Sequence, residues 1–173
     1  MRPVKNNQDF VSPMTDVTDV TVELYDTTTL SLVTSTTAVL KTDGTAVCTF
    51  SSAPSGSFYL TVKGSNFIQT WTASPVTVGS TPLAYDFSDA ATKAYGDNMA
   101  LIDTGVYGFF SGELNGDGNV DNADFSLWET DANDFAFGAY ITDLNGDGNV
   151  DNADFSIWEA NANNFVFSVT PTP

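Results

Sequence analysis

A twelve-residue acidic segment occurs twice in this chain, and it limits what the second half can fold into. Residues 113–124 have the sequence Glu-Leu-Asn-Gly-Asp-Gly-Asn-Val-Asp-Asn-Ala-Asp, and residues 143–154 repeat it with Asp in place of the first Glu. Oxygen-bearing side chains recur at positions 1, 3, 5, 9 and 12, and position 6 is glycine, which is the spacing of a calcium-binding loop. The repeat therefore predicts two Ca²⁺ sites.

The predicted ligands follow from loop position. Position 7 is expected to act through its backbone carbonyl oxygen and position 9 through a water molecule. The first loop supplies Glu113, Asn115, Asp117, Asn119, Asp121 and Asp124, and the second supplies Asp143, Asn145, Asp147, Asn149, Asp151 and Asp154. Because Glu113 is one methylene longer than the aspartate expected at position 1, we expect the first site to be the weaker one. The Asp at position 12 has a shorter reach than the usual Glu, which favours monodentate binding.

Only one helix is predicted beside each loop, and it follows the loop. The segment 107–112 before the first loop is aromatic and interrupted by glycine, which indicates an extended chain. Asp121 can cap a helix over residues 122–129, and Asp151 can cap its counterpart in the second repeat. The tryptophans of these helices, Trp128 and Trp158, are expected to pack the two helices against each other. Each repeat is therefore predicted to be half of an EF-hand.

With these loops and following helices, residues 113–167 resemble a known family, the type I dockerin repeat, in which a calcium loop and its following helix occur twice in tandem. The apolar positions of that pattern are held by Leu114, Leu144, Val120, Val150, Phe125 and Phe155. The resemblance implies the dockerin fold and its metal ligands. It does not extend to cohesin binding, because dockerins carry small hydroxylated residues at loop positions 10 and 11, where this chain has Asn122 and Ala123, then Asn152 and Ala153.

The charge distribution supports a cation in the second half and excludes some partners. The formal net charge is −17, and no Lys or Arg occurs after Lys93. Crowded carboxylates repel one another, and a bound cation removes that cost. Nucleic acid is not expected as a partner, because binding phosphates requires clustered Lys and Arg. No apolar run is long enough for a transmembrane helix, so we expect no membrane insertion.

The first half is predicted to be all β. Short segments rich in Val, Thr and aromatic residues are separated by turn residues; the expected strands are 17–25, 30–40, 45–50, 58–62, 69–72, 76–78 and 83–87. Alternation along 20–24 predicts strands with one buried and one solvated face. We expect a Greek-key β-sandwich that resembles the carboxypeptidase regulatory-like, prealbumin-like domains of surface and secreted proteins of Bacteroidetes.

The overall prediction is a mainly β chain with a small domain of helices and calcium loops. The predicted divisions are an N-terminal arm at 1–14, the β-sandwich at 15–96 and the dockerin-like domain at 97–173. A short helix capped by Ser88 is expected over 89–95, between the two halves. Because no Pro, Gly or Ser tract marks a hinge, we expect the halves to pack together.

Catalysis is not predicted. The chain has no His, which removes the usual general base. Its single cysteine, Cys48, alternates with Ala46 and Phe50 and is expected to be a buried thiol. Trp71 beside Tyr59 can form a sugar-stacking platform, but a core position is the favoured interpretation.

Three functions remain open. The favoured one is a structural or display protein of an extracellular assembly, above all a virion component such as a phage decoration, fibre or tail protein. Residues 1–10 lack the apolar core of a signal peptide, so we expect either a replaced signal or release without secretion, as in phage assembly. The alternatives are a secreted surface module that binds glycans or a protein partner, and a cohesin-binding dockerin.

Overall fold

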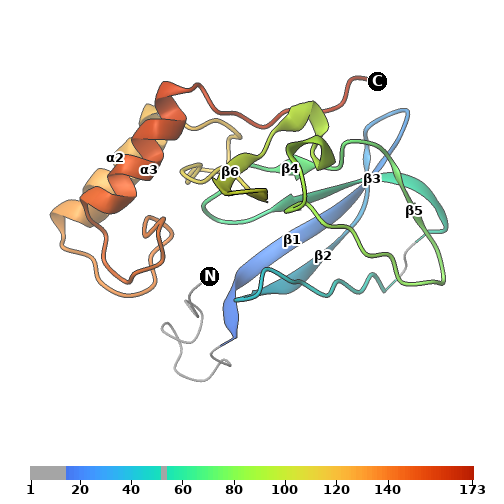
Figure 1. Ribbon diagram of the computed structural model, residues 1–173, viewed down its shortest axis with the longest axis horizontal. Helices are drawn as coiled ribbons and strands as arrows, with labels where there is room; N and C mark the ends of the chain where they lie inside the picture. Colours follow the sequence, from blue (N-terminus) through green and yellow to red (C-terminus); the bar gives the residue numbers. More distant parts are fainter. Residues whose placement is uncertain (1–14, 52–53) are drawn as a thin grey trace.

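The computed structural model describes residues 15–51 and 54–173; the predicted arm at 1–14 lies outside this part. The described strands are β1 (Asp16–Asp26), β2 (Leu32–Lys41), β3 (Gly56–Lys63), β4 (Thr70–Trp71), β5 (Val76–Val78), β6 (Ala100–Asp103) and β7 (Val106–Gly108). Two α-helices follow them, α2 (Asn122–Asn133) and α3 (Asn152–Asn163). The strands come first and the helices last, at one end of the molecule (Figure 1). The prediction of a mainly β chain is confirmed.

The main sheet is antiparallel, with strands in the order β2-β1-β3-β4 and β5 paired to β3. The central strand β1 pairs Val22 with Thr36 of β2 on one side and with Val62 of β3 on the other. Alternate residues of β1 point to the same face, and this face carries Val20 and Val22 into the first hydrophobic core. The alternating Val pattern of residues 20–24 therefore sets the register of the sheet.

The opposite face of β1 is not solvated throughout, contrary to the sequence prediction. Glu23 is 4% exposed, and its cross-strand neighbour Thr61 is fully buried. Lys63 Nζ lies 2.8 Å from Glu23 Oε1, and Gln69 Nε2 donates to Glu23 Oε2 at 2.8 Å. The carboxylate is buried because charged and polar groups of neighbouring strands satisfy it.

Two predicted strands, 45–50 and 83–87, are not strands. The first is an extended segment beside β2, where Thr36 Oγ1 donates to the carbonyl oxygen of Thr49 at 2.9 Å. Its apolar side chains still pack, because Cys48 and Phe50 contact the first core. In the second segment the ring of Phe87 packs on Phe109. Alternating apolar residues thus bury their side chains here without forming a backbone ladder.

The predicted helix at 89–95 is also wrong. The structure has two 3₁₀ turns instead, at Ala91–Lys93 and Tyr95–Asp97. Ser88 does not cap them, because its backbone N–H and hydroxyl both donate to Asp86 Oδ1. Gly96 interrupts the segment with a φ of +67°. A helix this short is marginal without packing, and the extended backbone of Ala94 (φ −96°, ψ 149°) separates the two turns.

The two helices begin where the sequence predicted and run further than residue 129. Asp121 caps α2 and Asp151 caps α3, each through a capping box. Between the helices lie four aromatic rings, Phe125, Trp128, Phe155 and Trp158, whose neighbouring centroids are 5.1 to 6.1 Å apart. The prediction that Trp128 and Trp158 pack α2 against α3 is confirmed, and Figure 1 shows the helices side by side.

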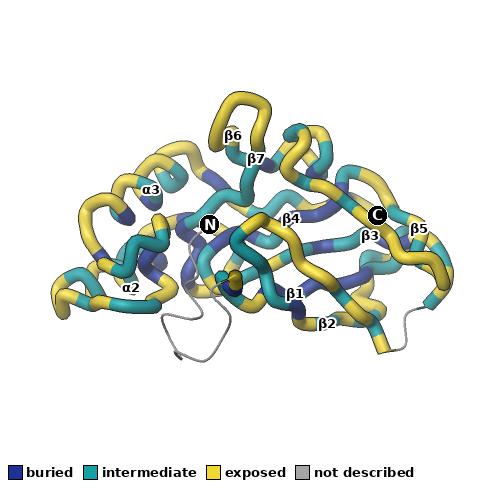
Figure 2. The backbone as a smooth tube through the Cα atoms, turned by 60° about the horizontal axis from the view of Figure 1, so that its bottom comes forward, coloured by how far each residue is buried: buried dark blue, intermediate teal, exposed yellow. Residues whose placement is uncertain are grey.

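The two halves share their cores, which confirms that they pack together. Ile68, from the connection between β3 and β4, is fully buried against Val120, Trp158 and Val166 of the second half. Conversely, Phe109 of the second half packs against the first core, where its ring stacks on Phe67 with the centroids 5.0 Å apart. Figure 2 shows buried residues both in the sheet and at the helical end of the molecule.

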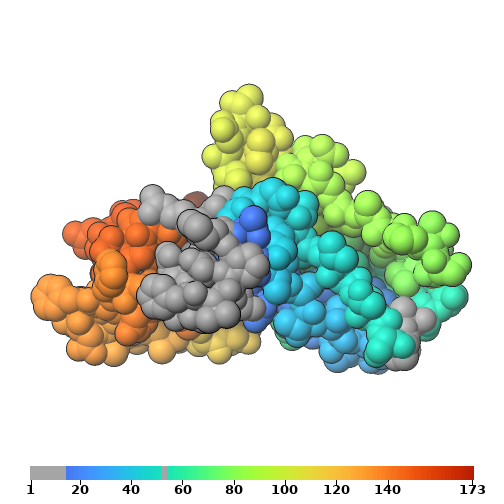
Figure 3. Space-filling model, turned by 90° about the horizontal axis from the view of Figure 1, so that it is seen from below, coloured from blue at the N-terminus to red at the C-terminus, as the bar shows by residue number. Residues whose placement is uncertain are grey.

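One hairpin departs from this compact body. Strands β6 and β7 form a two-stranded sheet that projects from the molecule, as Figures 2 and 3 show. Its residues Leu101 and Ile102 are both 65% exposed. Among the described residues, no helix has the length and apolar character needed to cross a membrane.

Candidate metal site

The two acidic loops lie directly before α2 and α3, and their glycines adopt the predicted turn. Gly118 and Gly148, at position 6, have φ angles of +89° and +92°. A side chain is strained in this region of backbone conformation, whereas glycine enters it freely. The requirement for glycine at position 6 is therefore met in both loops, and the chain turns sharply between the predicted ligands at positions 5 and 7.

The carboxylate at position 1 is buried in both loops and accepts backbone N–H groups. Asp143 Oδ1 accepts from Gly146 at 2.8 Å and from Asp147 at 3.1 Å, and its Oδ2 accepts from Gly148 at 2.8 Å. Glu113 Oε1 accepts the equivalent two bonds, from Gly116 and from Asp117. The two carboxylates share these two bonds, and Asp143 Oδ2 accepts the third, from Gly148. The sequence likewise located the difference between the loops at position 1, where Glu113 is one methylene longer.

The carboxylate at position 12 closes each loop onto its helix. Asp124 and Asp154 are both fully buried. Asp124 Oδ1 accepts from the backbone of Leu114 at 2.7 Å, while its Oδ2 accepts from Asp121 N at 2.8 Å as part of the capping box. The sequence predicted Asp124 and Asp154 only as metal ligands. Their second role as reciprocal caps follows the spacing of position 9 to position 12.

The remaining predicted donors lie near solvent and are held by local bonds. Asp117 Oδ1 accepts from Asn119 N at 2.8 Å, and its Oδ2 accepts from Asn115 Nδ2 at 3.1 Å. The second loop repeats this arrangement with Asp147, Asn149 and Asn145. Asp121 and Asp151 each use Oδ1 to cap the following helix. Such bonds fix the orientation of potential ligands before any ion binds.

The electrostatics of the loops favour a cation. Burial raises the pKa of Glu113, and the backbone N–H of Gly116 partly opposes this rise. Burial likewise raises the pKa of Asp143 and of Asp154. A raised carboxyl pKa means that the ionised form is costly where it stands. No Lys or Arg occurs after Lys93, although Lys63 of the first half lines a cavity together with Glu113.

The donor chemistry of the loops suits a hard ion. Carboxylate, amide and backbone oxygens are the ligands that Ca²⁺ prefers. In the part of the chain that the structure describes, no three acidic or cysteine side chains converge on one point. The carboxylates predicted as ligands at positions 1, 5 and 12 of each loop are therefore not seen gathered around one point, and the loops also offer Asn and backbone oxygens. The two Ca²⁺ sites remain a prediction.

Each loop pairs with a segment that sequence reasoning did not identify. The segment that follows α3 in the chain forms two bonds with the first loop. Val120 N donates to Val166 O at 2.9 Å, and Ser168 N donates to Gly118 O at 2.7 Å. The segment that follows α2 in the chain forms two bonds with the second loop. Val150 N donates to Ala136 O, and Gly138 N donates to Gly148 O. The segment after the second helix thus holds the first loop, and the segment after the first helix holds the second loop. The pairings of the first loop are long-range, and those of the second loop join it to a segment a few residues before it; no local spacing signals either set.

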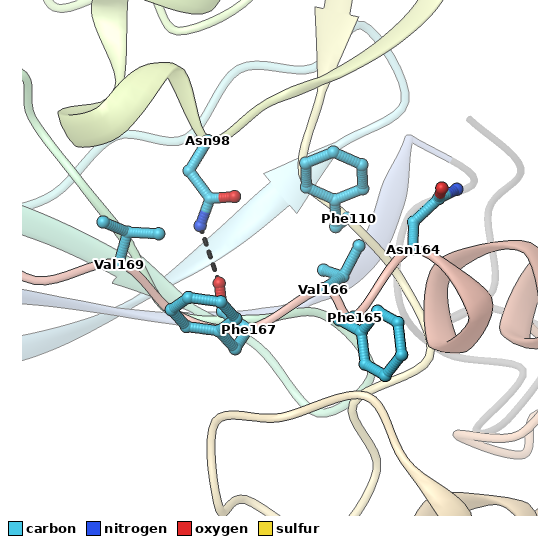
Figure 4. A pocket seen from close by; sticks show the side chains of 7 residues that line it. All are labelled: Asn98, Phe110, Asn164, Phe165, Val166, Phe167 and Val169. Atoms are coloured by element: carbon cyan, nitrogen blue, oxygen red, sulfur yellow. Dashed lines mark hydrogen bonds between the residues drawn. The ribbon is translucent and has the colours of Figure 1, made fainter.

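The C-terminal segment also borders an apolar pocket of about 260 Å³. Figure 4 shows its lining residues, which are Asn98, Phe110, Asn164, Phe165, Val166, Phe167 and Val169. Asn98 Nδ2 donates to the carbonyl oxygen of Phe167 at 2.9 Å. The lining has no ionisable side chain.

Two other candidate residues lie in the N-terminal half. Trp71 is 4% exposed and contacts Tyr25 with ring centroids 4.5 Å apart, so the favoured core interpretation is confirmed. Cys48 is half-buried against the first core, and burial raises the pKa of its thiol. A raised pKa lowers the fraction of reactive thiolate.

Comparison with known proteins finds no matching family model, no similar curated protein and no similar solved structure.

Proposed function

We propose that this chain is a non-catalytic, calcium-stabilised structural protein in which two Ca²⁺ ions rigidify residues 97–173. In the same proposal, these residues form a dockerin-like pair of half EF-hands, and the N-terminal half is a Greek-key β-sandwich. The observation that supports the proposal most is the burial of the carboxylates at positions 1 and 12 in both loops. Glu113 is 6% and Asp143 5% exposed, and the sequence around them carries no basic residue.

The loops' own residues have distinct parts in this proposal. The buried carboxylates and the Asn and Asp side chains at positions 3 and 5 offer oxygens, and the backbone N–H groups hold those oxygens in place. A bound Ca²⁺ would supply the positive charge that offsets the cost of burying the carboxylates. The ion therefore acts on stability, because a ligand that binds only the folded chain shifts the folding equilibrium toward it.

Ion binding in this half is expected to stabilise the sheet as well. Ile68 belongs to the N-terminal half and is fully buried among Val120, Trp158 and Val166. Ile68 N also donates to Phe110 O at 3.1 Å, and Gly112 N donates to Asn66 O at 2.9 Å. Because these contacts cross between the halves just before the first loop, order in that loop supports the connection between β3 and β4.

The setting we propose is an extracellular assembly, most specifically a virion, with other proteins of that assembly as partners. Extracellular calcium modules work at about 10⁻⁴–10⁻³ M affinity, which suits loops with an Asp at position 12. Detection of the chain in purified particles tests this setting. Its recovery only from cell envelopes or culture medium would favour the surface-module alternative instead. Glycan binding through Trp71 is not part of the proposal, because that ring is buried.

Calorimetric calcium titration of the full chain tests the proposed function. Two ions per chain are expected, together with a lower melting temperature after chelation. Asp117→Asn and Asp147→Asn are matched variants that remove one ligand charge from each loop, and each should weaken one site only. Asp103→Asn is the control, because this exposed acid lies in the β6–β7 hairpin. No calcium uptake at millimolar concentration, with no effect of chelator, contradicts the proposal.

A further inference from the structure

The two loops differ in the residue that the opposite repeat places beside position 6. Ser168 N donates to Gly118 O in the first loop, and Gly138 N donates to Gly148 O in the second. Ser168 and Gly138 thus hold equivalent places in the two repeats. Only the first loop receives a side-chain hydroxyl there, so the chain offers this loop an oxygen that the second loop lacks.

The hydroxyl of Ser168 is enclosed but unsatisfied. Its Oγ is buried and has no hydrogen-bond partner within the described part of the chain. It lies 3.5 Å from the position that a Cβ atom would take on Gly118. Buried hydroxyls are almost always paired with protein, water or an ion. The position of Ser168 therefore indicates that its oxygen has a partner other than the protein groups around it.

The space beside this hydroxyl is the cavity that contains the first loop's ligands. Ser168 lines a cavity of about 380 Å³ together with Glu113, Asp117 and Asn119, which are the predicted ligands at positions 1, 5 and 7. Lys63, at the end of β3, and Gln69, just before β4, also line it. Glu113 is more than nine-tenths buried, and its Oε1 accepts backbone N–H groups. The unpaired oxygen and the buried carboxylate thus border one volume.

We propose that Ser168 supplies a further oxygen ligand to the Ca²⁺ ion of the first loop. This inference rests on the calcium binding proposed above. Ca²⁺ takes six to eight oxygens, and a monodentate Asp124 leaves a place that a neutral hydroxyl fills without adding negative charge. The first site then combines residues of the first loop with Ser168, which follows α3.

The C-terminal segment is already positioned for this role. Asn98 Nδ2 donates to Phe167 O beside Ser168. On the other side, Val169 lies so close to Gly96 that an added Cβ on the glycine would be 2.9 Å from Val169 Cγ1. The backbone around Ser168 is therefore fixed by contacts independent of the ion, which reduces the entropy lost when its hydroxyl coordinates the metal.

The test is Ser168→Ala, with Ser126→Ala as the control. Ser126 is an exposed serine of α2 whose hydroxyl donates to Asn122 O at 3.1 Å, away from the cavity. Calcium titrations followed by NMR through the amides of Gly118 and Gly148 report each loop separately. Ser168→Ala should weaken the first site on the order of tenfold and leave the second unchanged. Ser126→Ala should change neither. Unchanged affinity at Gly118, or equal losses at both loops, overturns the inference.

A second measurement keeps the test independent of affinity. Terbium ions replace calcium, and Trp158, whose Nε1 donates to Asp121 O at 3.1 Å, can sensitise an ion in the first loop. Luminescence decay in H₂O and D₂O counts the bound waters. Ser168→Ala should raise the apparent number of bound waters, because a water with two O–H oscillators replaces a hydroxyl with one, and an unchanged count overturns direct ligation. If the unaltered chain takes up neither ion, the proposed function fails. If it binds two ions and the serine variant behaves like it, only this inference fails.

Discussion

Trp158 Nε1 donates a hydrogen bond to the backbone carbonyl oxygen of Asp121, 3.1 Å away, and so joins the second helix to the end of the first loop. The residues are 37 positions apart. Trp128, the counterpart of Trp158 in the first repeat, has a buried Nε1 without a partner among the described residues. The repeat is therefore symmetric in sequence at this position and asymmetric in hydrogen bonding.

This asymmetry gives the first prediction. Trp158→Phe should lower the free energy of unfolding by about 1 kcal/mol more than Trp128→Phe, since only the former loses a hydrogen bond. Both changes leave the ring in the same aromatic cluster, but Trp158 is buried and Trp128 only partly buried, so the difference between the two losses is an upper estimate of the bond's contribution. Urea denaturation of the two variants measures it. Equal losses would show that packing, and not the indole N–H, sets the preference for tryptophan at residue 158.

A second prediction concerns the buried carboxylate of the sheet. Glu23→Ala removes the partner of both Lys63 and Gln69 and should cost about 2 kcal/mol of stability. The loss is limited because the Lys63 side chain is 46% exposed and can be hydrated. Asp89→Ala is the control, because its 3.7 Å contact with Lys93 is exposed and should contribute less than about 0.5 kcal/mol. Chemical denaturation distinguishes the two, and similar values would contradict a structural role for Glu23.

A third prediction follows from backbone strain after α2. Phe135 has a φ of +53° and is 88% exposed, so its side chain gains little from packing. Phe135→Gly should raise stability by about 1 kcal/mol, because glycine adopts this conformation without strain. Phe137 is also largely exposed, at 77%, but it is not among the residues with positive φ. Phe137→Gly should therefore destabilise the chain. Thermal melts in calcium test the pair, and a loss in both variants would argue against strain at Phe135.

A fourth prediction concerns pH. Backbone N–H groups of Thr29 and Thr28 donate to Asp26 Oδ1 in the turn between β1 and β2, and they lower the pKa of this carboxyl. A lowered pKa contributes stability that is present above the unfolded value, near pH 4, and is lost as the pH falls through the folded value. An NMR titration should place the Asp26 pKa below that of a free aspartate. Asp26→Asn should weaken the dependence of stability on pH in that range, and an unperturbed pKa would contradict the prediction.

Much of the second half could be predicted because its signals are local. The glycines at position 6 and the caps at Asp121 and Asp151 depend on residues within one loop or one turn, and spacing alone identifies them. The same holds for the core face of β1, where alternate Val residues point one way. By contrast, the segment 45–50 alternates like a strand, yet no strand pairs with it. Pairing depends on the position of distant segments, which alternation does not record.

Other features of the site could not be predicted for the same reason. Glu23 appears in the sequence as a polar residue on a solvated face, and its burial is explained by Lys63, Gln69 and the hydroxyl groups of Tyr25 and Thr61, which contact its carboxylate. Ser168 lies outside the repeat as the sequence defined it, and no motif links it to Gly118. What the sequence provided was the chemistry of each loop; the neighbours that complete each loop come from the folded arrangement.

Each loop pairs with the segment that follows the other repeat's helix, and this limits how residues 113–168 can be divided into fragments. A fragment ending near residue 141 would retain the first loop and α2 but would lack residues 166–168, which pair with that loop. Its own segment 136–138 would have no second loop to pair with. Neither repeat is therefore a self-sufficient building block. Any shortened version of the chain must therefore keep both repeats or remove both, because each loop forms backbone hydrogen bonds to the segment that follows the other repeat's helix.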